Sequence, residues 1–502
     1  MGFGLGWWIL VILFFGWSLY FKAMIKKKKL EKEEMMSSGG EQIKAAAAIP
    51  RGRSGWPFIG ETLDFIACGF TSRPATFMDK RKSLYGKVFK THILGRPVIV
   101  STDADVNRVV LQNQGNIFVP YYPKSITDLL GESSILQMNG TLQRRVHALI
   151  GGFLRSPQLK ARMAREIENS VKLTFSGWNH KRTIYLQEET KKITFEALVR
   201  MLMSIDPGED LNFLRREYGE FIKGLICLPI RFPGSRLYKS LKAKERLLEM
   251  VRRVVEKRKA AMDKTNEKGT AWTNDAVDVL LRDASECGGE GNQRLPLDFI
   301  SGNIVEMMIP GEDSVPMAMT LAVKFLSDSP VALSRLVEEN MELKRQKGAC
   351  CEDYAWTDYM SLNFTQNVIS ETLRMANIIN AVWRKALKDV EIKGFFIPKG
   401  WCVLASFCSV HMDEENYENP YEFNPWRWEK PGGAAVNSNS FTPFGGGQRL
   451  CPGLEISRLE ISIFLHHLVT SFRWVAGKDE IVNFPTVKMK RKLPITIFPM
   501  DH

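Results

Sequence analysis

Apolar residues recur along most of this chain at the three-to-four-residue spacing of helices that bury one face. Stretches with this spacing predict helices near residues 156–178, 187–204, 209–226 and 236–264. Alternation typical of strands is rarer: residues 87–101 and residues 389–400 each predict a β-hairpin around a Gly/Pro-containing turn. The pattern therefore predicts a mainly α fold with small β-sheets.

The N-terminus departs from that pattern. Residues 3–21 carry no charge, and Lys22 and the lysines at 26–29 follow at once. A helix of about 20 apolar residues just spans a bilayer core. The charge follows the apolar run and no small-residue cleavage site is present, which favours a retained anchor over a cleaved signal peptide. The aromatic and lysine flanks disfavour a buried core helix. We predict a transmembrane signal anchor over residues 1–22, with everything after it in the cytosol.

The next two segments predict a connection between anchor and domain. Residues 23–48 are basic and polar, then rich in Ser, Gly and Ala, and show no apolar face, which is typical of a linker. Residues 49–60 contain Pro50, Pro57 and several glycines, which predict a stiff hinge. We expect a single catalytic domain over residues 61–502.

One cysteine near the C-terminus lies in a run suited to a metal-bound cofactor: Phe444-Gly-Gly-Gly-Gln-Arg449-Leu-Cys451-Pro-Gly453. The glycines allow a tight turn against a flat cofactor. Arg449 offers a planar donor fork to a carboxylate, and Phe444 can shield the sulfur. An apolar-periodic run from Leu454 predicts a helix with Pro452 at its first position and Cys451 at its positive end. A phosphate-binding loop, the alternative, would end in Gly-Lys-Ser/Thr.

A long apolar helix predicted from about residue 297 to residue 327 is interrupted in its interior. Pro310, Gly311 and Pro316 are costly inside a helix, so we expect the helix to open near Pro310. Sequences usually place residues that disfavour the local helix at functional sites. An opened turn can hold a water or an oxygen ligand, and Asp313 and Ser314 would supply an acid and an alcohol. The alternative is an ordinary kinked helix with a surface acid.

A third candidate feature is the pair Glu371 and Arg374, which lie three residues apart on a predicted amphipathic helix and so share one face. Alone, this spacing is as typical of an exposed ion pair that contributes little. Arg427 follows downstream within Asn-Pro-Trp-Arg-Trp.

Together these runs resemble the cytochrome P-450 family, over about residues 49–500. The cysteine run resembles the family's haem-binding signature, and the Pro310 run its oxygen-activation motif, with Pro310 in place of Ala or Gly and Ser314 in place of Thr. Glu371, Arg374 and Arg427 resemble its structural salt-bridge triad, a second shell behind the haem loop.

The resemblance implies haem b (iron protoporphyrin IX) held by Cys451 as its metal ligand. It also implies that Arg449 and Arg384 pair with the propionates and that Phe444 covers the sulfur. The family usually places Trp or His, and Arg four residues later, at a propionate; Gln143 and His147 stand there in this protein. That propionate contact is therefore not carried over to them.

The activity implied is monooxygenation, in which NADPH–cytochrome P-450 reductase supplies two electrons and one oxygen atom enters a C–H bond. The net charge of +13 suits an acidic reductase and a membrane surface. No zinc-finger spacing or RNA-binding signature is present, so we expect no nucleic-acid partner. The resemblance places the enzyme at the endoplasmic reticulum membrane, single-pass, with a cytosolic catalytic domain.

The substrate class comes from less specific segments. Residues 309–316 and the hinge segment 49–57 resemble plant enzymes of isoprenoid-hormone metabolism. Residues 118–131 resemble the brassinosteroid hydroxylases that act on a sterol side chain, in particular the C-23 hydroxylases. Four alternatives stay open: a C-22 or other brassinosteroid oxidase, a gibberellin-pathway diterpenoid oxidase, a reductase-independent haem-thiolate isomerase, and a membrane-tethered haem or sterol binder without activity.

Overall fold

A computed structural model describes residues 47–500, apart from residues 72, 114, 179–181, 266–274, 287–294, 430–438 and 485. The chain divides into two units, Met1–Ala48 and Ile49–His502. The first unit, with the predicted anchor over residues 1–22 and the predicted linker over 23–48, lies almost wholly outside the described residues, and the domain scheme stays a prediction. Among the described residues, no helix is long and apolar enough to cross a membrane.

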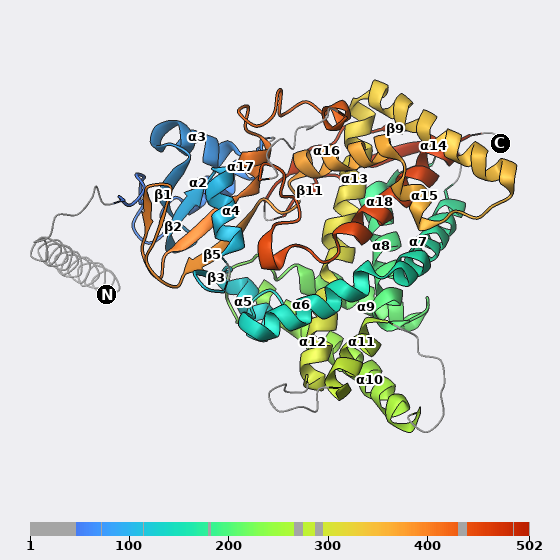
Figure 1. Cartoon of the computed structure of the whole chain (residues 1–502), viewed down its shortest axis with the longest axis horizontal. Coiled ribbons are helices and arrows are strands. Elements are labelled where there is room, and N and C mark those ends of the chain that lie inside the picture. The colour runs from blue at the N-terminus through green and yellow to red at the C-terminus, as the bar shows by residue number, and fades with distance from the viewer. Residues whose placement is uncertain are drawn as a thin grey trace, which may run out of the picture. The chain divides into compact units, whose positions relative to one another are not determined.

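The second unit is mainly helical (Figure 1). Its α-helices are α2 (Thr62–Cys68), α3 (Thr76–Tyr85), α4 (Ala104–Gln112), α5 (Lys124–Leu130), α6 (Gly140–Arg155), α7 (Pro157–Ser176), α8 (Leu186–Met203), α9 (Glu209–Ile222), α10 (Arg236–Thr265), α11 (Ala276–Glu286), α12 (Leu297–Met307), α13 (Val315–Asp328), α14 (Pro330–Cys350), α15 (Trp356–Met360), α16 (Asn363–Ala376), α17 (Phe407–His411) and α18 (Leu454–Ser471). Shorter helical turns are η1 (Pro310–Ser314), η2 (Pro425–Trp428) and η3 (Gly447–Arg449).

The strands form small sheets, as the sequence predicts. They are β1 (Val88–Ile93), β2 (Arg96–Ser101), β3 (Phe118–Pro120), β4 (Thr183–Tyr185), β5 (Ala381–Ala386), β6 (Val390–Ile392), β7 (Phe395–Ile397), β8 (Cys402–Ser406), β9 (Phe472–Ala476), β10 (Ile481–Val482), β11 (Lys488–Met489) and β12 (Pro494–Pro499). The largest sheet has the order β1-β2-β8-β5-β3, and the others are β4-β12-β9, β10-β11 and β6-β7.

Both predicted hairpins are confirmed. β1 pairs with β2 in antiparallel register, from Val88 opposite Ser101 to Ile93 opposite Arg96. β6 and β7 are joined by Lys393 and Gly394, whose φ angles of 51° and 79° are both positive. Two consecutive positive φ angles match the right-handed twist of the strands and define the common two-residue hairpin turn.

The four predicted helices are confirmed as α7, α8, α9 and α10, with ends that differ from the expected ones by a few residues. Buried apolar residues recur on one face of α7, among them Leu159, Met163, Ile167 and Val171. The helix begins where Ser156 accepts a hydrogen bond from the Leu159 backbone and Pro157 occupies the first turn.

The predicted long helix is present and broken as expected. α12 and α13 follow one another in a line in Figure 1, and α13 packs against α8, α14, α16 and α18. Between them, η1 is a single wide turn in which the Val315 backbone N–H donates to the Pro310 carbonyl, five residues back. This turn frees the carbonyl of Gly311, which accepts a hydrogen bond from the Thr194 hydroxyl of α8 at 2.6 Å.

Candidate functional site

The loop before Cys451 is a tight turn that needs its glycines. Gly445 and Gly447 have φ angles of 74° and 63°, and a Cβ on Gly447 would lie 2.2 Å from the backbone oxygen of Leu111. The Cys451 backbone N–H donates to the Phe444 carbonyl at 3.1 Å, which closes the loop. The prediction that Pro452 opens the following helix is wrong, because α18 begins at Leu454 with Gly453 as its N-cap.

Cys451 therefore lies three residues before Leu454, the first residue of α18. Burial raises the pKa of the Cys451 thiol, and a hydrogen bond from the Gly453 backbone acts in the opposite direction. A partly exposed sulfur of this kind becomes a thiolate when a metal cation binds it. The donor type and the glycine turn beside it fit a haem iron ligand.

Two arginines, Arg384 and Arg449, place positive charge in this region. Arg384 of β5 is 3% exposed, and its Nε has no hydrogen-bond partner within the described part of the protein. Burial, and then the charge of Arg384, lower the pKa of Arg449 to about 10. A buried unpaired N–H beside a second guanidinium is costly unless an anion neutralises the pair. The unpaired Nε of Arg384 beside the charge of Arg449 fits a haem propionate, the pairing that the family resemblance implies.

Asp313 and Ser314 lie together in the wide turn η1, both partly exposed. Burial raises the pKa of Asp313, and the charges of Lys191 and Lys488 oppose that shift. Lys191 of α8 forms its ion pair with the neighbouring Glu312, with 2.8 Å between Nζ and Oε1. An acid with a raised pKa beside a hydroxyl has the chemistry of a proton-delivery pair.

Glu371, Arg374 and Arg427 form one buried network. Arg374 donates through Nε and Nη2 to the two Glu371 oxygens at 2.9 and 2.8 Å, and Arg427 Nε donates to Oε1 at 2.9 Å. Glu371 and Arg374 are fully buried and Arg427 is 9% exposed. The exposed-pair alternative is therefore excluded for Glu371 and Arg374. Glu371 also accepts from the Trp428 indole at 3.0 Å, a contact that was not predicted from the sequence.

The network reaches the cysteine loop through His411. Arg374 donates to the His411 carbonyl at 2.8 Å. The His411 ring lies 2.8 Å from the Asn377 side-chain oxygen through Nδ1 and accepts from the Thr442 backbone at 3.1 Å through Nε2. Burial lowers the pKa of His411 to about 3, so the ring is neutral and can serve as donor and acceptor at once. Thr442 in turn accepts from Gly445, at the start of the loop.

Gln143 and His147 of α6 contact the cysteine loop itself. Gln143 donates to the Gln448 carbonyl at 3.2 Å, and His147 Nε2 lies 2.8 Å from the Leu450 carbonyl. These positions, to which no propionate contact was carried over, thus bind backbone on either side of Arg449. Their spacing of four residues on one helix face was the available signal.

Comparison with known proteins shows the family of this protein. Residues 50–497 match the cytochrome P450 family. The protein therefore belongs to the cytochrome P450 family, whose members carry haem and act as monooxygenases with electrons from a redox partner.

Two curated relatives from Arabidopsis thaliana are similar along most of their length. The protein is 68% identical to 3-epi-6-deoxocathasterone 23-monooxygenase CYP90C1 over 91% of this chain and 86% of that protein. It is 53% identical to 3-epi-6-deoxocathasterone 23-monooxygenase CYP90D1 over 89% of each. Among solved structures, retinoic acid bound cyanobacterial CYP120A1 superposes with a TM-score of 0.78 at 24% identity, over 91% of this protein and 100% of that one. That likeness supports the fold.

Proposed function

We propose that this protein is a haem-thiolate monooxygenase that hydroxylates a brassinosteroid precursor of the 3-epi-6-deoxocathasterone type at C-23 of the sterol side chain. The identity of 68% over 91% of the sequence to a 23-monooxygenase carries the proposal. The resemblance of residues 118–131 to the same group supports it independently of the haem motifs.

In this proposal Cys451 would hold the iron of haem b through its sulfur, and Arg384 and Arg449 would pair with its propionates. The Nη groups of Arg449 contact residues 135–139, so its Nε and its charge would be its share of that pairing. When bound, haem supplies the oxygen activation that the thiolate promotes. Phe444 lies half-buried against the main apolar core and shields the sulfur side from water. Glu371, Arg374 and Arg427 hold the loop from behind. Asp313 and Ser314 move protons to the oxygen-binding side.

Replacing the Ser314 hydroxyl tests the proton step. We expect Ser314→Ala to bind sterol normally but to lose product per electron consumed, by up to about 10²-fold, with peroxide released instead. Measured NADPH consumption, peroxide and product check this. Ser301→Ala is a matched control, because that hydroxyl of α12 donates to the Leu297 carbonyl of its own helix. Unchanged coupling in Ser314→Ala would remove Ser314 from the proton path.

The proposal includes a membrane location with the signal anchor over residues 1–22, the linker over 23–48, the hinge over 49–60 and the catalytic domain over 61–502. Apolar side chains on two segments of the second unit support contact with lipid. Trp56, Phe58 and Leu63 are 78%, 69% and 67% exposed, and Leu228 and Phe232 are each 74% exposed.

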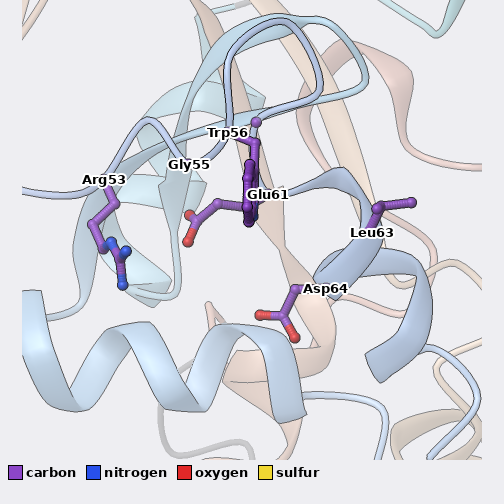
Figure 2. A pocket seen from close by; sticks show the side chains of 7 residues that line it. Arg53, Gly55, Trp56, Glu61, Leu63 and Asp64 are labelled. Atoms are coloured by element: carbon purple, nitrogen blue, oxygen red, sulfur yellow. The ribbon is translucent and has the colours of Figure 1, made fainter.

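Figure 2 shows the first of these segments. Trp56 and Leu63 line a shallow pocket of about 370 Å³ together with Arg53, Glu61 and Asp64. Arg81 neutralises both carboxylates, with 2.9 Å to Glu61 and 2.8 Å to Asp64. An exposed tryptophan beside paired charges suits the boundary between lipid and water.

Turnover by microsomes containing the full-length protein and NADPH–cytochrome P-450 reductase tests the proposal. We expect 3-epi-6-deoxocathasterone to give a 23-hydroxylated product that requires NADPH and is identified by mass spectrometry. A C-22 product, a diterpenoid product or turnover without reductase would assign the protein to another oxidase or to an isomerase. Activity recovered in the supernatant instead of the microsomal pellet would contradict the membrane location.

A further inference from the structure

A buried carboxyl on α12 lies outside the catalytic set described above. Glu306 is 6% exposed and stands four residues before the wide turn η1. Its Oε2 accepts a hydrogen bond from the Ser134 hydroxyl at 2.7 Å and another from the Ile135 backbone at 3.0 Å. Ser134 and Ile135 belong to the segment between α5 and α6, some 170 residues away in the sequence.

The same segment is held on its carbonyl side by Arg449. That guanidinium donates to the carbonyls of Ile135 and Leu136 at 3.4 and 3.2 Å and to the Asn139 side-chain oxygen at 2.9 Å. It also donates to the Met138 carbonyl. We call residues 134–139 the bridging segment. At its start, the Ser134 hydroxyl and the Ile135 N–H donate to Glu306 of α12. Further along, its carbonyls accept from Arg449, which lies two residues before Cys451.

Titratable side chains lie on three helices that neighbour α12, namely α9, α10 and α11. Lys244 of α10 attracts the carboxylate and donates to the Leu129 and Leu130 carbonyls at 2.9 and 2.7 Å, just before the bridging segment. Tyr218 of α9 donates to the Val305 carbonyl at 2.9 Å. On α11, Asp283 is paired with Arg145 of α6. The charged group that faces Glu306 most directly is thus Lys244.

We propose that Glu306 is a positioning residue of the monooxygenase site. Together with Arg449 it clamps residues 134–139 and so fixes α12 relative to the Cys451 loop. Ile135 and Leu136 are half-buried apolar residues packed on the main core, so the clamp also sets where their side chains stand. The expected effect of the clamp on substrate binding rests on the proposed sterol hydroxylation. The clamp itself rests only on the hydrogen bonds described above.

The clamp depends on the charge of Glu306. Burial, opposed by the Ser134 hydroxyl and Lys244, raises the pKa of Glu306 to about 7. Glu306 contributes most to folding stability below the ordinary carboxyl pKa. Its contribution falls as pH rises toward about 7, because burial disfavours the charged carboxylate. The charged form is, however, the better acceptor for two donors. Sterol affinity should therefore strengthen as pH rises through about 7.

Hydrogen exchange on the haem-loaded, full-length protein tests the clamp without any substrate. We expect Glu306→Gln to increase amide exchange in the peptide containing Ile135 and Leu136 by about ten-fold or more, since a hydrogen bond to a charged group is lost. Ser134→Ala, which keeps the Glu306 carboxylate, should increase amide exchange in that peptide by less. Ser301→Ala is the control, because its hydroxyl bonds within α12. Unchanged exchange in both Glu306→Gln and Ser134→Ala would overturn the clamp.

Optical titration with 3-epi-6-deoxocathasterone, from about pH 6 to about pH 8.5, tests the effect on substrate. We expect wild-type affinity to rise with a midpoint near the pKa of Glu306, and Glu306→Gln to bind about ten-fold more weakly and without that midpoint. A flat wild-type profile, or one that Glu306→Gln keeps, would overturn the positioning role. A wild type that does not respond to this sterol would contradict the proposed substrate and leave the exchange result as the test of the clamp. Should Glu306→Gln fail to fold, Ser134→Ala and the wild-type pH profile decide.

Discussion

Cys451→Ala should abolish the thiolate-type carbon monoxide difference spectrum and all sterol hydroxylation. Alanine removes the only sulfur in the glycine loop, and the backbone bond from Cys451 to Phe444 that closes the loop does not need the side chain. The loop should therefore keep its shape and lose its metal ligand. Spectra of the purified variant reduced under carbon monoxide are the measurement.

Cys350→Ala is the matched control, because Cys350 is an exposed free thiol at the end of α14. It should have the wild-type spectrum and turnover. A thiolate-type spectrum retained by Cys451→Ala would show that another residue ligates the iron and would remove the central assignment.

Glu371→Gln should prevent stable folding or haem retention. The substitution keeps the side-chain volume but leaves the guanidinium of Arg374, fully buried, and that of Arg427, nearly so, without their counter-charge. Removing one partner of a buried ion pair costs about 3–5 kcal/mol, a large part of the ordinary domain stability of roughly 5–15 kcal/mol. The measurements are thermal unfolding and the yield of haem-loaded protein.

Glu342→Gln provides the comparison for that loss. Glu342 pairs with Arg345 three residues along α14, in a bidentate contact of 2.9 and 2.7 Å whose side chains are 48% and 71% exposed. Solvent screens such a pair, so its loss should leave the unfolding transition where it is. If Glu371→Gln matched this control, the network would not be what holds the haem loop in place.

Features that depend on a few neighbouring residues could be predicted from the sequence. Pro310 breaks the helix wherever it is packed, since it has no N–H to donate and its ring displaces a carbonyl. The hairpin turn at Lys393 and Gly394 follows the same local logic, because the turn itself demands the positive φ angles that both residues adopt. The glycine loop before Cys451 was predictable for the same reason.

Features that depend on distant partners could not be predicted in this way. Gln143 and His147 bind carbonyls of Gln448 and Leu450, about 300 residues later in the sequence. Glu306 showed one signal, an acid inside the apolar run of α12, but its partners lie between α5 and α6. The start of α18 was placed too early because Pro452 and Gly453 form a turn whose geometry is set by the loop.

The pairing of β2 with β8 has a consequence for how the protein is made. Val98 lies opposite Cys402 in parallel register, so the β1-β2 hairpin acquires its neighbour only after about 300 further residues. At about 5–20 residues per second, that interval is roughly 15 to 60 s of ribosome time. During it the hairpin presents an unpaired strand rich in valine and isoleucine, a template for pairing with other nascent chains. Chaperone occupancy of β2 during synthesis is therefore expected to influence the yield of this protein.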